Sequence, residues 1–264
     1  MVGAFYTREG DAFVATELTR GPWDPGSQHA GPPSGLLARE IEKCEPAEGK
    51  QVARITTEIL RPVPLGRLSV GARVIRPGRS VELIEAELSD EDGPLMLARA
   101  WRIRSEAVEL PDGLPRQEAP PGPAEGEEGK FPVTGSEGYW TAMEYRFVEG
   151  GFDQTGPALG WLRMRVPLVE GEDPTPLVRV MAAADSGNGV SAALDWNEWL
   201  FINTDLTVHL HRMPEGDWVC LDAVTIPEAT GVGMADTKLS DERGPIGRAV
   251  QSLLVAPRRR RRSS

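Results

Sequence analysis

One short sequence occurs twice in this chain, and the repeat restricts its possible folds more than any other feature. Residues 88–94 (LSDEDGP) return as residues 239–245 (LSDERGP), a separation of 151 residues (239 − 88). Upstream, residues 60–64 (LRPVP) are echoed by residues 210–214 (LHRMP) at a separation of 150 (210 − 60). Ser-Asp-Glu-x-Gly is a hairpin-turn sequence, so each copy predicts a solvent-facing turn. Two similar turns could arise by coincidence, but their common order indicates two copies of one fold, with any site between them.

Each copy combines one helix with alternating strands. A Gly/Pro-rich start and apolar residues at helical spacing predict a helix over residues 31–44, and alternation predicts strands over residues 52–60, 68–76, 81–88 and 95–103. The second copy repeats this order, with a strand over residues 158–166, a helical region over 174–194, and strands over 203–211, 218–225, 232–239 and 247–255. The fold class predicted is α+β, with each helix packed on a curved antiparallel sheet.

The sequence divides into four parts. Residues 1–106 are the N-terminal repeat, residues 107–137 a linker rich in Pro, Glu and Gly, residues 138–257 the C-terminal repeat, and residues 258–264 a basic tail. With 264 residues and 40% hydrophobic content, the chain can build a substantial core. We expect the tail to be solvated and disordered; attachment to an anionic surface or to nucleic acid is the alternative.

Charge and hydropathy exclude several classes of protein. The net charge is −11, and without the five arginines of residues 258–262 it becomes −16 (−11 − 5), which argues against nucleic-acid binding. No apolar run approaches the ~18 residues of a membrane span, and the N-terminus does not resemble a signal peptide, so we expect a cytoplasmic protein. Cys44 and Cys220 are too few for a disulfide framework or a zinc quartet, and are expected to be buried thiols.

Asp185 is the first candidate for chemistry, because apolar residues precede and follow it at 181–184 and 190–194. Burying an unpaired charge costs several kcal/mol, so a carboxylate here needs partners. The glycine-containing segment after it, including Gly187, can bring backbone N–H groups close. Asp185 is therefore either a helix N-cap or a catalytic carboxylate.

Two amide side chains are further candidates. Alternation in the last strand places Gln251 on the apolar face, where it is either satisfied by neighbouring backbone or functional. Asn203, followed by Thr204, opens another strand, a place where polar residues are common. Four tryptophans in the second half and near the first helix are candidates to close a pocket, although large aromatics are more often core: Trp23, Trp140, Trp196 and Trp199.

Several segments together resemble the acyl-CoA thioesterase II family: AAADSGNG around Asp185, LTVHLHR at residues 206–212, and RAVQSLLV around Gln251. The first half, with HAGPPSGLLARE from residue 29, is also similar to these proteins. The resemblance covers nearly the whole chain apart from the linker and tail. It implies a double hot-dog fold, hydrolysis of an acyl-CoA without a cofactor or metal, and a homo-oligomer of two or more chains.

The resemblance also implies roles for particular residues. Asp185 and Gln251 match the family's aspartate and glutamine, but Asn203 stands where its hydrolases carry a threonine. Thr204 could replace that threonine only if the alignment slips by one, because strand neighbours face opposite ways. Asp185 would act as base or orient the water, with Asn203 and Gln251 fixing that water. Backbone N–H groups near the first helix start would stabilise the oxyanion, and the expected substrate-contacting residues are Gly31, Pro32, Gly35, Gly187 and Thr204.

Other functions remain open at this point. A hot-dog dehydratase or hydratase would pair a histidine with an acid, and His29 alone lies near such a place. A non-catalytic acyl-thioester-binding protein is the second alternative. His209 and His211 share a strand face, and we interpret them as structural rather than as metal ligands. The 151-residue offset places Ala100 opposite Gln251 and no carboxylate opposite Asp185, so we expect the second copy to carry the chemistry.

Overall fold

The computed structural model describes residues 3–44, 49–115, 117–132 and 137–258. The first half contains β1 (Tyr6–Glu9), β2 (Ala12–Ala15), η1 (Glu17–Thr19), α1 (Gly31–Lys43), β3 (Lys50–Ile59), β4 (Arg67–Arg76), β5 (Val81–Asp90) and β6 (Gly93–Arg104). The second half contains η2 (Pro123–Glu125), β7 (Glu127–Glu128), α2 (Tyr139–Ala142), β8 (Met143–Glu149), β9 (Ala158–Met164), α3 (Pro176–Ala184), α4 (Gly187–Val190), β10 (Trp199–Asn203), β11 (Asp205–Leu210), β12 (Val219–Pro227), β13 (Val232–Asp241) and β14 (Gly244–Pro257).

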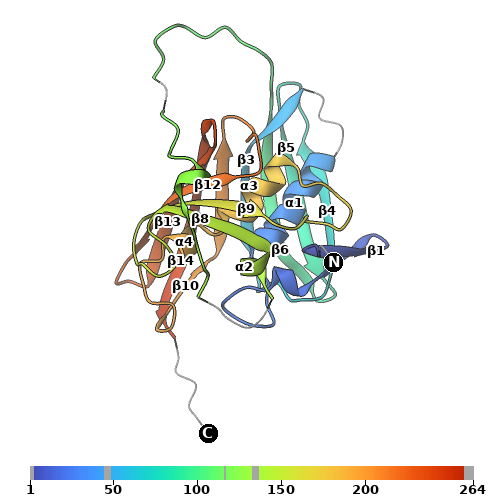
Figure 1. The fold of residues 1–264 in the computed structure, drawn as a ribbon. Coiled ribbons are helices and arrows are strands. Elements are labelled where there is room, and N and C mark those ends of the chain that lie inside the picture. The colour runs from blue at the N-terminus through green and yellow to red at the C-terminus, as the bar shows by residue number, and fades with distance from the viewer. Residues whose placement is uncertain (1–2, 45–48, 116, 133–136, 259–264) are drawn as a thin grey trace.

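The two halves have the same strand order and share one sheet (Figure 1). The first half runs β2-β4-β5-β6-β3 and the second β9-β12-β13-β14-β11, and antiparallel pairing of β3 with β11 joins them. Thr56 and Thr207 face each other at this junction, with their hydroxyl oxygens 3.1 Å apart. These two residues are 151 apart in sequence (207 − 56), the spacing of the repeated turn. The duplication and the α+β class are therefore confirmed.

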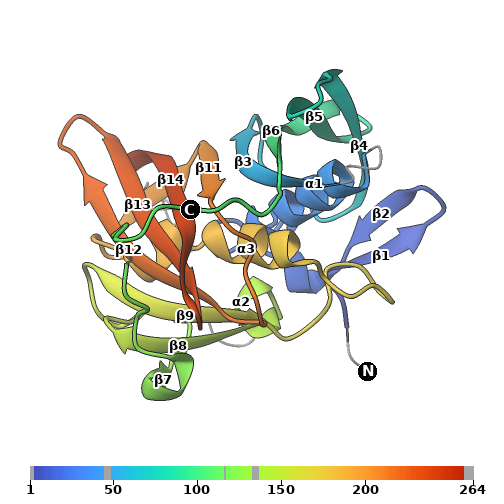
Figure 2. The same ribbon diagram turned by 90° about the horizontal axis from the view of Figure 1, so that it is seen from above.

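Helices α1 and α3 pack antiparallel between the two halves of the curved sheet (Figure 2). The buried face of α1 carries Leu36, Leu37 and Ile41, and nearly every residue of α3 is buried. The start of α1 approaches the end of α3 so closely that a Cβ at Gly31 would lie 2.4 Å from the carbonyl oxygen of Ala182. The helix pair thus brings residues of both repeats together at one point.

The repeated turns are the β5–β6 and β13–β14 hairpins, and each is held by an arginine. Arg61 donates to Asp90 and to the carbonyls of residues 93 and 94, and Arg212 donates to Asp241 and to the carbonyls of residues 244 and 245. The two arginines are 151 residues apart (212 − 61), so the upstream echo has the same offset as the turn, rather than 150. The expectation of solvent-facing turns is wrong for Asp241, which is fully buried beneath Arg212.

Some local expectations differ from the structure. The predicted helical region over residues 174–194 is interrupted after α3. The strand predicted over residues 203–211 corresponds to β11, and β10 before it was not predicted. The predicted linker contains η2 and β7, and Trp161 Nε1 donates to the carbonyl of Pro121 over 2.9 Å. Of the predicted tail, Arg258 is bonded to the backbone of residues 198 and 199, and residues 259–264 lie outside the described part.

Cys44 is half-buried and Cys220 is buried, and no disulfide forms within the part of the chain that the structure describes. Burial, and to a smaller extent the nearby Asp222 carboxylate, raise the pKa of the Cys220 thiol to about 12. A thiol with such a pKa carries very little thiolate at neutral pH, so Cys220 is not suited to nucleophilic chemistry. No helix of the described residues is long and apolar enough to cross a membrane.

Candidate active site

Asp185 lies at the C-terminal cap of α3 and is only 3% exposed. The interpretation as a helix N-cap is wrong, because the following short helix, α4, is preceded by Ser186, and no side chain caps it. The carbonyl end of a helix carries partial negative charge, which disfavours an anion there. A buried carboxylate at this position is therefore held by other groups.

Asn203 and Gln251 provide two of those groups, so the structure brings the three predicted candidates together. Asn203 Nδ2 donates to Asp185 Oδ1 over 2.8 Å. Gln251 Nε2 lies 3.4 Å from the same oxygen and donates to the Asp185 carbonyl over 3.1 Å, while its Oε1 accepts from the Asn188 N–H. A Cβ at Gly187 would lie 3.1 Å from Gln251 Oε1, which explains a glycine at this turn. Gln251 thus joins the carboxylate to the backbone of α4.

The third group is His29, which comes from the first repeat and precedes α1. Its Nδ1 lies 3.0 Å from Asp185 Oδ2, and its ring stacks on Tyr139 with centroids 3.7 Å apart and planes inclined by 7°. The Tyr139 hydroxyl donates to the Ala182 carbonyl over 2.6 Å, which fixes the stacked pair against α3. Burial lowers the pKa of His29, and the Asp185 carboxylate opposes this shift. The candidate site is therefore shared between the two repeats.

Sequence reasoning did not place His29 among the site residues and considered it only for a rival function. The available signal was its position just before the glycine-rich start of α1. This start of α1 lies against the end of α3. A lone histidine gives no indication of its partner. The contact with Asp185 spans 156 residues (185 − 29) and depends on the packing of the two helices.

The other predicted site residues have different positions. The Gly31 N–H points at His29 Nδ1 over 3.0 Å, Pro32 has no N–H, and a Cβ at Gly35 would lie 3.1 Å from a Leu168 methyl. Only the Gly31 N–H is thus directed at the site from the start of α1. Thr204 is exposed, and its hydroxyl lies 3.4 Å from Asp205 Oδ1, so the structure does not bring it to Asp185.

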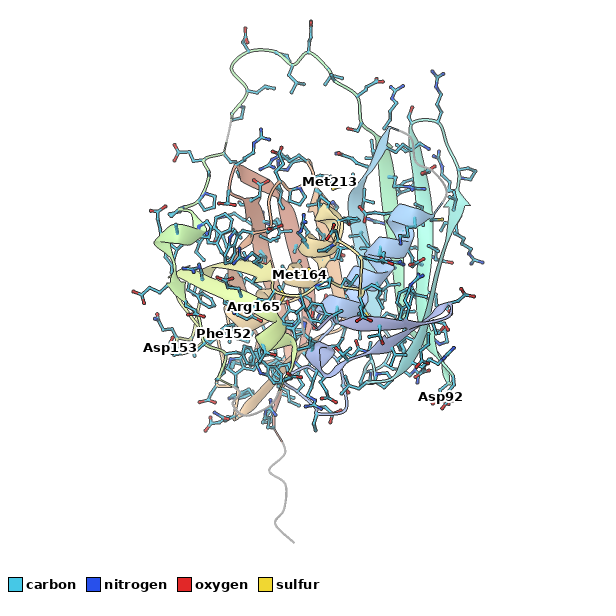
Figure 3. The ribbon with its side chains drawn as sticks, turned by 45° about the vertical axis from the view of Figure 1, so that its right-hand side comes forward. Asp92, Phe152, Asp153, Met164, Arg165 and Met213 are labelled. Atoms are coloured by element: carbon cyan, nitrogen blue, oxygen red, sulfur yellow. The ribbon has the colours of Figure 1, made fainter. Side chains whose placement is uncertain are left out.

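A cavity of about 20 Å³ adjoins His29 and is lined mainly by aromatic rings. The rings belong to Trp23, Phe131, Tyr139, Tyr145, Phe152 and Trp196. Trp23 stacks on Trp196 with ring centroids 4.8 Å apart, and Trp140 stacks on Phe131 with centroids 5.7 Å apart. Phe131, Phe152 and Trp196 also line a wider outer pocket of about 450 Å³, so the aromatic cluster separates His29 from that pocket. In Figure 3, Phe152 and Asp153 lie on the side of α2 and β8.

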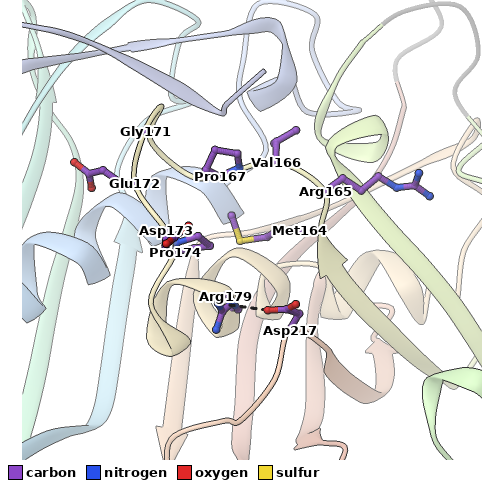
Figure 4. A pocket seen from close by; sticks show the side chains of 10 residues that line it. All are labelled: Met164, Arg165, Val166, Pro167, Gly171, Glu172, Asp173, Pro174, Arg179 and Asp217. Atoms are coloured by element: carbon purple, nitrogen blue, oxygen red, sulfur yellow. Dashed lines mark ion pairs between the residues drawn. The ribbon is translucent and has the colours of Figure 1, made fainter. Parts of the chain in front are cut away.

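Other pockets lie away from these residues. One of about 480 Å³ is formed by the segment between β9 and α3 and contains the Arg179–Asp217 ion pair (Figure 4). None of the candidate site residues lines it. His209 and His211 are exposed on the sheet, and the described residues contain no cluster of three or more side chains suited to a metal ion.

Two family models match this chain. Residues 19–103 match the acyl-CoA thioesterase N-terminal domain, and residues 111–255, more than half of the chain, match the acyl-CoA thioesterase C-terminal domain. The chain belongs to the acyl-CoA thioesterase family. It is a thioesterase II-like double hot-dog protein, in which β2–β6 with α1 and β9–β14 with α3 are the two hot-dog repeats.

Solved structures share this fold at low sequence identity. A protein from Thermobifida fusca YX assigned to thioesterase II superposes with a TM-score of 0.72 at 19% identity, covering 96% of this chain and 95% of its own. A hot-dog protein of unknown function from Alicyclobacillus acidocaldarius has a TM-score of 0.71 at 14% identity, covering 96% of both chains. The acyl-CoA thioesterase II TesB2 of Mycobacterium marinum has a TM-score of 0.62 at 14% identity, covering 96% and 95%. No curated protein sequence matches this thioesterase-family chain.

The two hot-dog repeats differ at the positions of Asp185 and Gln251. Counted from the first residue of each helix, Glu40 is the tenth residue of α1 and Asp185 the tenth from the start of α3. The 151-residue offset of the strands leads instead to Ser34 (185 − 151), so the absence of a carboxylate opposite Asp185 stays a prediction. Glu40, however, is half-buried and paired with Arg39. Ala100 is buried at the strand position that corresponds to Gln251.

Proposed function

We propose that this protein hydrolyses acyl-CoA thioesters to the free acid and CoA. The observation that carries the proposal is the buried Asp185 carboxylate, which receives Asn203, Gln251 and His29 at the junction of the two repeats. Membership of the acyl-CoA thioesterase family supports the substrate class. Phe131, Phe152 and Trp196 of the aromatic cluster beside His29 also line the outer pocket of about 450 Å³ and supply an apolar surface for an acyl group.

The chemistry requires a water, a group that takes its proton, and donors for the oxyanion. In the proposed mechanism the Asp185 carboxylate provides the negative charge that makes proton removal favourable, an effect typically worth ~10²–10⁴ in rate. Asn203 and Gln251 fix the orientation of this carboxylate, because each donates to Oδ1. The Gly31 N–H, at the first residue of a 13-residue helix, is the candidate oxyanion donor, and to serve as one it must turn from His29 Nδ1, at which it points in this structure.

The contact between His29 and Asp185 also bears on the hydratase alternative. A hydratase or dehydratase acts at two carbons of the acyl chain and uses an acid and a base at separate points of the substrate. Here the histidine and the acid lie 3.0 Å apart and bond to each other. Such a pair acts as one proton-transfer unit, which favours hydrolysis over addition or removal of water.

Release of free CoA thiol from short-chain, medium-chain and aromatic acyl-CoAs tests the proposal. We expect the wild type to hydrolyse at least one of them, and Asp185→Asn to lower kcat by ~10²–10⁴. Glu40→Gln, at the tenth residue of α1, is the matched control and should retain activity. Hydrolysis that survives Asp185→Asn would remove the mechanism. Binding of acyl-CoA without thiol release from any substrate would support the acyl-binding alternative.

The homo-oligomer and the cytoplasmic location stay predictions, and so does contact of Gly35, Gly187 and Thr204 with substrate. A solution mass measurement gives the number of chains in the assembly.

A further inference from the structure

His29 has two ring nitrogens, and only one of them has a partner among the described residues. Nδ1 lies 3.0 Å from both Asp185 Oδ2 and the Gly31 nitrogen. A neutral imidazole nitrogen is either a donor or an acceptor, so Nδ1 serves one of the two. We assign the proton to Nδ1, because a hydrogen bond to a carboxylate is charge-assisted and the stronger of the two. Nε2, the ring nitrogen that does not contact Asp185, then carries a lone pair.

The Asp185 carboxylate, by contrast, has both oxygens occupied. Oδ1 receives Asn203 and Gln251, and Oδ2 receives His29. The carboxylate is 3% exposed and is not among the residues that line the aromatic cavity, whereas His29 is. A water that approaches through this cavity therefore meets the imidazole before the carboxylate.

The size of the cavity fits this role. A volume of about 20 Å³ is sufficient for one water, which needs roughly 10–15 Å³. Besides His29, the polar side chains of Ser186 and Asn188 line it, so the space has hydrogen-bonding groups as well as aromatic walls. Stacking on Tyr139 keeps the ring from turning about its Cβ–Cγ bond. The cavity thus has room for one water beside the His29 imidazole.

We propose that His29 is the catalytic base of this thioesterase, with Nε2 removing a proton from the attacking water and Asp185 acting through Nδ1. The inference rests on the proposed function. The water oxygen forms a bond to the thioester carbonyl carbon as its proton passes to Nε2. When the tetrahedral intermediate collapses, the carbon–sulfur bond breaks, and the imidazolium returns the proton to the leaving thiolate. The products are the acid and CoA thiol, and His29 is again neutral.

The surroundings of His29 keep its base form available. The titratable groups that face it are Asp185 from α3 and Tyr139 from α2, and Tyr145 of β8 lines the same cavity. Burial raises the pKa of both tyrosines, so neither of them carries a charge near neutral pH. Burial also lowers the pKa of His29 itself, with Asp185 opposing. The neutral imidazole is thus present at pH 7, and the Asp185 charge stabilises the imidazolium that forms during the reaction.

His29→Asn separates a catalytic from a positioning role. The asparagine Nδ2 can take the place of His29 Nδ1 and donate to Asp185, but it has no counterpart of Nε2. We expect His29→Asn to lower kcat by ~10²–10⁴ while KM for acyl-CoA changes little. In the wild type, kcat/KM should fall as the pH is lowered and His29 becomes protonated. Because burial lowers the pKa of His29, this fall should lie below pH 6.5, the ordinary pKa of histidine being about 6.5. This acidic limb should be absent from the residual activity of His29→Asn.

The outcomes distinguish this inference from the proposed function. If His29→Asn keeps its activity within tenfold of wild type and retains the acidic limb, His29 is a positioning residue, and the inference is overturned while hydrolysis itself stands. If the wild type hydrolyses no acyl-CoA, the proposed function is removed and the inference with it. Thermal unfolding of His29→Asn and Asp185→Asn tests whether each variant is folded. His209→Asn, an exposed histidine far from the aromatic cavity, is the matched control and should behave as wild type.

Discussion

Arg212→Met is expected to destabilise this protein much more than the same change at Arg61, although the two arginines hold the same turn in the two repeats. Asp241 is fully buried and accepts hydrogen bonds from both terminal nitrogens of Arg212 over 2.5 Å. Asp90 accepts a hydrogen bond from one nitrogen of Arg61 over 2.8 Å and is partly exposed. Removing Arg212 therefore leaves a buried carboxylate without its cation, whereas Asp90 remains hydrated.

The magnitude follows from this burial. Breaking a buried ion pair by removing one partner costs roughly 3–5 kcal/mol. The Arg212 side chain is 30% exposed, so water screens part of the interaction. Backbone N–H groups of residues 215 and 243 also still donate to Asp241. We therefore expect Arg212→Met to lower the free energy of unfolding by about 2–4 kcal/mol, and Arg61→Met by clearly less.

Urea unfolding of both single variants and the double variant measures these losses. Burial raises the pKa of Asp241, but hydrogen bonds from Arg212 and two backbone N–H groups outweigh this and leave the pKa lowered. A lowered pKa contributes stability that is present above the unfolded value of about 3.9 and is lost as the pH falls through the folded pKa. The difference between Arg212→Met and wild type should therefore shrink in acid. Equal losses in the two single variants at neutral pH would refute the argument.

Two further predictions concern the second repeat. Gly187→Ala should lower kcat and destabilise the fold by about 1–3 kcal/mol. The reason is that the alanine Cβ would lie 2.6 Å from Thr237 Oγ1 and 3.1 Å from Gln251 Oε1. Unchanged activity would show that Gln251 need not hold its position. The buried Cys220 thiol, with a pKa raised to about 12, should react with a thiol reagent only after unfolding, as followed by mass spectrometry at pH 7.

Much of the fold was predictable from the sequence, because local patterns specify it. Alternating residues in β4 and β5 and the turn residues before β6 appear directly in the sequence, as does the duplication. The short strand β1 was not predicted, since four residues give too little periodicity. The helical region after residue 174 breaks at Asp185, where a polar residue satisfies tertiary partners rather than the helix.

The candidate site was predictable only in part, for a physical reason. Asp185 and Gln251 are polar residues in apolar surroundings, a conflict that is visible within a few neighbours in the sequence. His29 has no such conflict, because its neighbours are small, proline or polar residues. Its significance depends on antiparallel packing of α1 against α3, which no local pattern specifies.

The relation between the two helices has a consequence for how this chain can change over evolutionary time. The pocket before α3 (Figure 4) holds the place in the second repeat that the segment containing His29 holds before α1 in the first. At that counterpart, Arg39 binds Glu172 and Glu40, and the pair of helices is held by an ion cluster instead of a site. Under the proposed function, one helix junction of the duplicated fold carries the chemistry and the other carries an ion cluster. This second junction is where a new activity could arise without loss of the first.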